Sequence, residues 1–433
     1  MAVLDRLLNA VVRYGPLTVI DSRGRPHSYG MGVGALRPVT VRIVDRATEW
    51  ALLRRPSLAM GEAYMDGRLR IEQGDTRALL DLVAYNFRWD ADGGAAPSLW
   101  RPWRLLAGFD SLNRRARSRR NVAHHYDLSD RLYDLFLDAD RQYSCAYFVE
   151  PEVGLERAQY DKKAHIAAKL DLKPGQRVLD IGCGWGGMAL YLNKVADVDV
   201  LGITLSKEQL QVARRRAVAA GVADRVRFDL IDYRDVAGTF DRIVSVGMFE
   251  HVGPPHYRAF FHKCRSLLAT DGVMLLHTIG RADGPTATDP WVAKYIFPGG
   301  RVPALSEIAP ALEHERLWLT DLEVLRLHYA RTLDHWYDRV QAARREIETL
   351  YDARFFRMWE YYLAGAAAAF RYEAHVVFQL QLARRQEAVA LTRDYVGRAE
   401  RRLRAEEGRR PSDRSEIGVE AGELRGDLVL REE

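Results

Sequence analysis

The sequence predicts an α/β protein built on a doubly wound parallel sheet with a helical cover, preceded by a small α+β domain. Between residues 177 and 277, short apolar runs alternate with longer amphipathic stretches, as strands alternate with crossover helices. A glycine-rich turn follows the first run, at the point where such sheets bind ligands. The chain before residue 90 shows instead the two-residue alternation of a half-buried strand, which indicates a separate unit.

The N-terminal α+β domain is expected over residues 1–90. Val39–Asp45 alternates apolar and polar side chains as a strand does, and Gly61–Arg70 adds a second ordered stretch. A linker is expected over residues 91–120, because Trp89–Ser98 is rich in glycine, alanine, proline and serine.

The linker also carries basic and aromatic residues. Trp100 and Trp103 stand among seven arginines, namely Arg101, Arg104, Arg114, Arg115, Arg117, Arg119 and Arg120. Basic residues near a membrane contribute roughly 1 kcal/mol each toward anionic headgroups, and tryptophan favours the interface. We therefore expect peripheral docking to an anionic membrane surface; a solvated linker without a partner is the alternative.

A catalytic domain is expected over residues 121–396. Five apolar runs predict its strands, at 177–181, 198–203, 225–231, 241–246 and 273–277. After a loop rich in proline and glycine at Gly284–Pro303, the segments Asp321–Leu350 and Ala353–Gln386 predict long helices that cover the sheet. Residues 397–433 are highly charged, and we expect a frayed helix followed by disorder.

Composition excludes several classes of protein. The chain has 433 residues, of which 48% are hydrophobic and 28% charged, as in a globular protein of two or three units. It has no run of roughly 20 apolar residues, and Asp5 and Arg6 interrupt the place of a signal peptide, so we expect a cytoplasmic protein. Three unpaired cysteines predict neither disulfides nor a metal site, and a net charge of +5 does not indicate nucleic acid binding.

The glycine-rich turn predicts a Rossmann-like cofactor site. Gly182, Gly184 and Gly187 match the spacing G-x-G-x-x-G, which lets the backbone approach a nucleotide cofactor. The second run ends in Gly202–Ser206 without the carboxylate that would hold a dinucleotide ribose, whereas Asp180 fits a methyltransferase. A nicotinamide site, and glycines that only pack the helix on the strand, are the alternatives.

Six short motifs in order resemble cyclopropane-fatty-acyl-phospholipid synthases and their mycolic acid relatives, over about residues 120–390. They are Tyr143–Phe148, the glycine turn, Thr204–Gln209, Asp232–Asp235, Phe240–Gly253 and His277–Gly280. The resemblance implies a class I methyltransferase sheet that binds S-adenosyl-L-methionine (SAM). With Asp180 and the glycines, the implied cofactor residues are Tyr143, Ser144, Asp180, Gly182, Gly184, Gly187, Thr204, Leu205, Gln209, Asp232, Tyr233 and Arg234. For Thr204 and Gln209, a helix N-cap and a surface position are the alternatives.

The resemblance also implies a reaction centre with bicarbonate as general base. Its residues are Cys145, Glu250, His277, Ile279 and Tyr329, with Cys145 contributing its backbone. Glu250 and His277 follow the fourth and fifth predicted strands and should meet at one sheet edge; a core histidine is the alternative for His277. Many relatives have a cysteine where this chain has Ala366, so no covalent thiol step is expected. Tyr295, Tyr329 and Trp336 are candidates to shield a cationic intermediate.

The expected function is SAM-dependent transfer of a methylene group to the cis double bond of unsaturated phospholipid acyl chains, which forms cyclopropane fatty acids. The alternative is methylation of the same double bond, which gives a methylene- or methyl-branched chain. A non-catalytic lipid-binding protein and a nicotinamide oxidoreductase are further alternatives. The resemblance implies a homodimer, and with the basic segment it places the protein at the inner face of the cell membrane.

Overall fold

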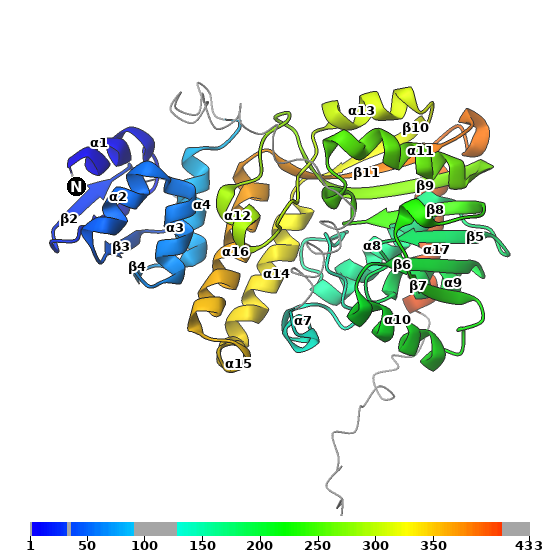
Figure 1. Ribbon diagram of the computed structural model, residues 1–433, viewed down its shortest axis with the longest axis horizontal. Helices are drawn as coiled ribbons and strands as arrows, with labels where there is room; N and C mark the ends of the chain where they lie inside the picture. Colours follow the sequence, from blue (N-terminus) through cyan, green and yellow to red (C-terminus); the bar gives the residue numbers. More distant parts are fainter. Residues whose placement is uncertain (1, 33–35, 91–127, 409–433) are drawn as a thin grey trace, which may run out of the picture.

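The computed structural model describes residues 2–32, 36–90 and 128–408. In Figure 1 a small N-terminal unit lies at the left and a large sheet at the right, with helices α14 (His328–Ala342) and α16 (Ala353–Tyr372) between them. Within the described ranges, no helix is long and apolar enough to cross a membrane. The domain boundaries stay a prediction, and the basic and aromatic linker segment lies outside the described residues.

The N-terminal unit is a four-stranded sheet with helices. Its strand order is β2 (Pro26–Tyr29), β1 (Leu17–Ile20), β3 (Val39–Ile43), β4 (Leu69–Gln73), and only β1 and β3 pair in parallel. Its helices are α1 (Ala2–Val11), α2 (Arg46–Arg54), α3 (Pro56–Met65) and α4 (Thr76–Asn86). Strand β3 confirms the predicted alternation, because Val39, Val41 and Ile43 are buried.

The large sheet has seven strands in the order β10-β11-β9-β8-β5-β6-β7. Their bounds are β5 (Arg177–Ile181), β6 (Asp199–Thr204), β7 (Val226–Leu230), β8 (Phe240–Val246), β9 (Leu268–Arg281), β10 (Trp318–Leu325) and β11 (His375–Ala383). Strands β5 to β9 pair in parallel, as predicted. Because β9 continues to Arg281, His277 lies inside a strand rather than after one, contrary to the sequence prediction.

The two antiparallel strands β10 and β11 correct the predicted long helices. Helix α14 begins only at His328 and α16 ends at Tyr372, so the predicted helices over 321–350 and 353–386 are each too long. In β11, Gln379 and Gln381 alternate with Leu380 and Leu382, which is the period of a strand. All four side chains are buried, so pairing with β9 and β10 overrides the helical pattern that precedes them.

Helices cover both faces of the large sheet. Residues of α8 (Leu155–Leu170), α9 (Gly187–Ala196) and α10 (Lys207–Ala219) share one apolar core with alternate residues of β5 and β6, such as Val178 and Val200. Residues of α11 (Tyr257–Leu267) and α13 (Leu305–His314) share the opposite core with Leu179 and Ile203. The doubly wound arrangement predicted from the alternation is therefore present.

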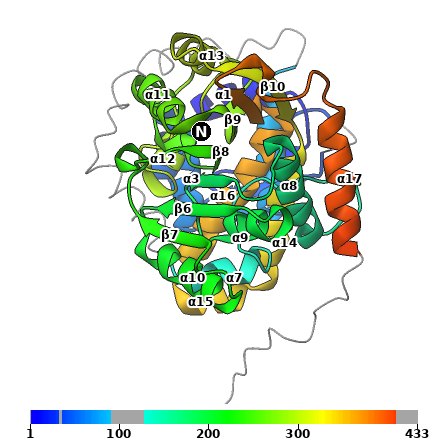
Figure 2. The same cartoon turned by 90° about the vertical axis from the view of Figure 1, so that its right-hand side faces the viewer.

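The C-terminal helix α17 (Asp394–Gly408) belongs to the first of these cores. Its Leu403 is buried in the same core as Ile166 of α8, and Figure 2 shows α17 lying along α8. The sequence predicts a frayed helix from residue 397, whereas the described part of this segment is a packed helix. The residues from 409 onward lie outside the described ranges.

The N-terminal unit is bonded to the helices that stand between it and the sheet. Tyr64 Oη donates to Glu360 Oε2 of α16 at 2.7 Å. A side chain at Gly61 of α3 would collide with the indole of Trp291 in α12 (Pro290–Tyr295), so only glycine lets these helices meet. Helices α3 and α4 therefore come close enough to form part of a cavity described below.

Candidate active site at the carboxyl edge of the sheet

One cavity opens at the carboxyl ends of β5, β6 and β8, and most of the predicted cofactor residues line it. They are Tyr143, Ser144, Asp180, Gly182, Gly184, Thr204, Leu205, Gln209, Asp232, Tyr233 and Arg234. Open α/β sheets bind ligands at this edge, so the cavity occupies the expected place. Gly187 is absent from its lining.

The three glycines of the loop do different things. Gly182 and Gly184 have φ of +85° and +54°, values that side chains rarely adopt. A Cβ at Gly184 would meet no described atom within 4 Å, so the backbone there faces open space. Gly187 starts α9, and a Cβ there would collide with the Asp140 carboxylate. The assignment of Gly187 to the cofactor therefore stays a prediction, and the structure shows that its missing side chain makes room for Asp140.

Thr204 and Gln209 form one buried unit. Thr204 Oγ1 donates to Gln209 Oε1 at 3.0 Å and accepts from the Ser206 N–H at 3.1 Å. Ser206 is the N-cap of α10, because its hydroxyl accepts from the Gln209 N–H. The alternative that made Thr204 a cap and Gln209 a surface residue is wrong. Because Oε1 already accepts from Thr204, the NH₂ group of Gln209 remains to donate a hydrogen bond.

Asp232 and Arg234 hold each other at the end of β7. Arg234 donates to the Asp232 carboxylate through Nε at 2.8 Å and through its terminal nitrogen at 2.5 Å. The carboxylate is almost fully buried, and the pair raises the pKa of Arg234. Asp232 is therefore fixed in the cavity wall, where its carboxylate oxygens are hydrogen-bond acceptors.

Asp180 is the buried carboxyl of the glycine loop. Its Oδ2 has no hydrogen-bond partner among the described residues, and burial raises the pKa of Asp180 to about 7. A buried acceptor without a partner costs free energy unless a ligand supplies a donor. Asp180 therefore fits a ligand that carries a positively charged or N–H group.

We expect Asp180→Asn to change the pH dependence of stability. The folded pKa lies above the unfolded value of 3.8, so the wild-type chain loses stability as the pH rises from about 4 to about 7. The melting temperature of the variant, minus that of the wild type, should increase across this window and then stay level.

Asp45→Asn is the matched control for this scan. Hydrogen bonds from Thr48 lower the pKa of Asp45, so the stability that Asp45 contributes is lost only below its unfolded pKa. The melting temperature of Asp45→Asn, minus that of the wild type, should therefore stay level above about pH 4. If the melting-temperature difference depended on pH in the same way for both variants, the assigned burial of Asp180 would be contradicted.

A second cavity of about 570 Å³ adjoins the first, and all five predicted reaction-centre residues line it. The two cavities share Tyr143, Ser144, Gly247 and His251. The volume is within the range of small-molecule sites, roughly 300–1,000 Å³. The two cavities are therefore adjacent chambers, and the four shared residues form their common wall.

Glu250 offers one free carboxyl oxygen to the second cavity region. It lies in the short helix η4 (Phe249–His251) after β8, and its Oε1 accepts from the Ile279 N–H at 2.6 Å. Its Oε2 is buried and has no partner in the part of the chain that the structure describes. Burial raises the pKa of Glu250, although the bond from Ile279 opposes this. The backbone of Ile279 thus holds Glu250.

His277 is buried, with Nδ1 lying 3.1 Å from Gln379 Nε2. Burial lowers the pKa of His277 well below its usual range, and the charges of Lys162 and Lys169 lower it further. The ring is therefore neutral at pH 7.

Cys145 and one of the three aromatic candidates line the second cavity. Cys145 Sγ donates to the Ala146 carbonyl at 3.3 Å, and burial raises the pKa of the thiol, so it is not a nucleophile. Of the three aromatic candidates, only Tyr329 lines the second cavity; Tyr295 donates its hydroxyl to Glu62, and Trp336 is core. Ala366 lines the cavity as well.

Sequence reasoning missed two polar residues that support the site. Lys162 donates to Gln142 Oε1 and Ser144 Oγ, both at 2.8 Å, from beneath the cofactor cavity. Gln379 contacts His277, and its alternation with Gln381 was the available signal. A lysine within a helical pattern gives no such signal, because lysines are usually exposed.

Comparisons with known proteins agree with this geometry. The family described as mycolic acid cyclopropane synthetase matches residues 113–380. The chain is 39% identical over 344 residues to the cyclopropane-fatty-acyl-phospholipid synthase of Escherichia coli (strain K12), covering 79% of this chain and 87% of that protein. It is 33% identical over 407 residues to tuberculostearic acid methyltransferase UfaA1 of Mycobacterium tuberculosis (strain ATCC 25618 / H37Rv), covering 88% and 91%.

A solved structure supports the same conclusion. Mycolic acid cyclopropane synthase CmaA1, complexed with SAH and CTAB, is 35% identical and superposes with a TM-score of 0.58, over 61% of this chain and 97% of that one. Together these matches decide the interpretation of the glycine loop in favour of a methyltransferase rather than a dinucleotide enzyme. The chain belongs to the mycolic acid cyclopropane synthetase family and is a SAM-dependent methyltransferase.

Proposed function

We propose that this enzyme transfers a methylene group from SAM to the cis double bond of unsaturated phospholipid acyl chains, forming cyclopropane fatty acids with bicarbonate as general base. The observation that carries this proposal is the common wall of the two cavities. Cofactor residues line one chamber and the reaction-centre residues line the other, so a bound acyl chain would lie beside the cofactor's reactive group.

The residues of the first cavity fit SAM. The unpaired Asp180 carboxyl suits the amino group of the methionine part, and the Gln209 amide suits a ribose hydroxyl. The fixed Asp232 carboxylate can accept from the adenine amino group. When bound, SAM supplies an electrophilic methyl group on a sulfonium. Gly184 keeps a side chain out of the open space that the cofactor needs.

The residues of the second cavity fit a small anion. Attack by the alkene on the methyl group would break the methyl–sulfur bond, release S-adenosylhomocysteine and leave a cation on the acyl chain, and loss of a proton from the new methyl group would close the ring. Bicarbonate would accept that proton. Glu250, whose raised pKa favours the protonated form, can donate through Oε2 and can relay the proton that bicarbonate takes up, and neutral His277 can donate through its ring. Tyr329 lies in the same wall.

The remaining wall of the second cavity suits an acyl chain. Much of it is apolar and includes Phe297, Leu333 and Phe370, and the charged residues Arg281, Asp289, Arg301 and Glu373 also line the cavity. The N-terminal unit adds Met60, Leu80 and Val83 from α3 and α4. An apolar enclosure also excludes water, which would otherwise quench a cation.

The runner-up function is methylation of the same double bond to give a methylene- or methyl-branched chain. One observation favours it: the match to tuberculostearic acid methyltransferase covers more of this chain, 88%, than the match to the E. coli synthase, 79%. Both reactions need the same first step, so the residues of the two cavities serve either.

Three further parts of the proposal concern the setting of the enzyme. We place it at the cytoplasmic face of the cell membrane, held peripherally by the basic and aromatic segment between residues 91 and 120. The anionic surface presents the phospholipid substrate there. We also propose a homodimer, as the resemblance implies.

Mass spectrometry of cellular lipids tests this proposal. The chain is expressed in cells that are rich in unsaturated phospholipids, lack cyclopropanes and are fed methyl-labelled methionine. We expect acyl chains that gain one labelled carbon in a saturated ring, which proton NMR identifies. A methylene branch or a methyl branch on an open acyl chain would establish the alternative, and unlabelled lipid with soluble, cofactor-binding protein would refute both.

A further inference from the structure

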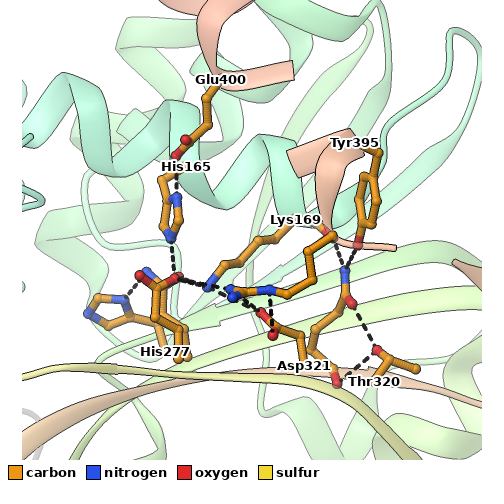
Figure 3. A network of polar contacts seen from close by, with 11 residues as sticks. His165, Lys169, His277, Thr320, Asp321, Tyr395 and Glu400 are labelled. Carbon is orange, nitrogen blue, oxygen red and sulfur yellow. Dashed lines mark hydrogen bonds and ion pairs between the residues drawn. The ribbon is translucent and has the colours of Figure 1, made fainter. Parts of the chain in front are cut away.

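A buried polar network leads from His277 to the far side of α8. Gln379 lies directly opposite His277, because β11 pairs with β9 in that register. Lys169 of α8 reaches the same place: its Nζ donates to Gln379 Oε1 at 2.9 Å. Figure 3 shows Lys169 and His277 in one continuous network that also holds His165, Asp321 and Glu400.

The orientation of the Gln379 amide follows from the chemistry of Lys169. A lysine ammonium has only donors, so it must face the amide oxygen, and the NH₂ group must face His277. Burial lowers the pKa of Lys169, but Glu323 Oε2 at 2.5 Å and Asp321 Oδ2 at 3.7 Å from its Nζ oppose this and favour the ammonium form. The assignment of Oε1 and Nε2 is therefore fixed by hydrogen bonding.

The amide orientation in turn determines where His277 carries its proton. The NH₂ of Gln379 donates, so Nδ1 of His277 must accept and carries no hydrogen. A neutral imidazole then has its one proton on Nε2. In Figure 3 the second ring nitrogen of His277 lies on the side away from the network, and the residue lines the second cavity.

We propose that Lys169 and Gln379 are positioning residues that fix His277 as the Nε2–H tautomer, so that its ring donates a hydrogen bond into the second cavity. The position of the proton on His277 does not depend on which reaction the enzyme catalyses, whereas the identity of the anion that receives the hydrogen bond rests on the proposed function. Without this pair, an acceptor nitrogen could face the anion and repel it. The pair therefore selects for a negatively charged or carbonyl-type occupant beside Glu250.

The network also explains why Lys169 keeps a single position. His165 Nε2 lies 2.7 Å from the same Glu323 oxygen that binds Lys169, and His165 Nδ1 bonds to Glu400 of α17. Tyr147 stacks on the His165 ring at 4.2 Å between centroids. Lys169 therefore cannot turn away without breaking a partly buried ion pair with Glu323 and the buried hydrogen bond to Gln379.

Nitrogen-15 NMR on the ligand-free enzyme tests the tautomer directly. Histidine is labelled in both ring nitrogens, and the His277→Gln chain identifies the His277 signals by their absence. We expect a protonated Nε2 and an unprotonated Nδ1 at pH 7. A proton on Nδ1, or on both nitrogens, would overturn the proposal. This measurement needs no substrate, so it tests the tautomer of His277 independently of the proposed function.

Gln379→Glu supplies the functional test, with Gln381→Glu as the matched control. A carboxylate at 379 can pair with Lys169 and can only accept from His277, so Nδ1 should gain the proton. Gln381 lies on the same strand and is equally buried, but it bonds to the Lys169 carbonyl, Tyr395 and Thr320 instead.

The expected result is a fall in kcat of about tenfold or more for Gln379→Glu, since one charge-assisted hydrogen bond is lost. The affinity for S-adenosylhomocysteine should stay within about twofold, and Gln381→Glu should keep kcat within about twofold. Equal kcat values for the two variants, or an unprotonated Nδ1 in Gln379→Glu, would refute the positioning role.

Discussion

Glu250→Gln should lower turnover by about 100-fold or more while leaving the affinity for S-adenosylhomocysteine nearly unchanged. Glutamine can still accept from the Ile279 N–H, so the local fold is kept. It cannot give up and regain a proton, however, and proton transfer by a positioned group contributes roughly 10²- to 10⁴-fold. Rates of S-adenosylhomocysteine release with unsaturated phospholipid vesicles, together with calorimetric binding, measure both quantities.

Glu315→Gln is the control for this substitution. Glu315 is also a buried carboxyl, but it bonds to Arg258 and His262 and lines neither cavity. Its variant should lose stability without a selective loss of turnover. If Glu250→Gln weakened cofactor binding instead of turnover, Glu250 would belong to the cofactor site and the anion site would be misassigned.

Gly184→Ala should lower cofactor affinity by about tenfold or more, equivalent to roughly 1.4 kcal/mol. The residue has φ of +54° and faces open space in the first cavity, so an added methyl group would occupy the room of the ligand. Equilibrium binding of S-adenosylhomocysteine measures the effect. The same substitution should also destabilise the fold by roughly 1–2 kcal/mol, because its backbone conformation is left-handed.

Gly221→Ala separates these two effects. Gly221 has φ of +68°, and a methyl group added there would likewise meet no described atom within 4 Å, but this glycine is exposed in the turn after α10. Both alanine variants should therefore melt earlier by a similar margin. Only Gly184→Ala should bind the cofactor more weakly; equal binding by the two variants would remove Gly184 from the cofactor site.

The sequence predicted the parallel core of the large sheet because its local signals agree with the tertiary structure. Strands β5 to β9 are apolar runs that need no knowledge of their neighbours, and the glycine loop stands at the end of the first one. The failures occurred where tertiary pairing decides. Residues 318–325 and 375–383 border long helices without a strong break, and they become strands only because β9 offers a free edge.

Gly187 shows the same limit at the scale of one residue. A third glycine at the right spacing indicates that another group lies close to its backbone, but the spacing cannot say whether that group is a cofactor or a part of the protein. The structure places the Asp140 carboxylate there, and this carboxylate pairs with Lys163 and Arg216. Asp140, Lys163 and Arg216 come from three separate segments, so no local pattern could reveal their contact.

The sequence by itself determined the fold class and the cofactor loop, and through the family resemblance it named the five reaction-centre residues and all of the predicted cofactor residues except Gly187 that line the two cavities. These properties depend on local backbone demands and on side-chain chemistry, which a single chain displays in order. Only the tertiary structure decided that the cavities share a wall, that Ile279 holds Glu250, and that Lys169 and Gln379 orient His277. Such contacts join residues far apart in sequence, and their geometry is set by the packing of α8 and β11 against β9.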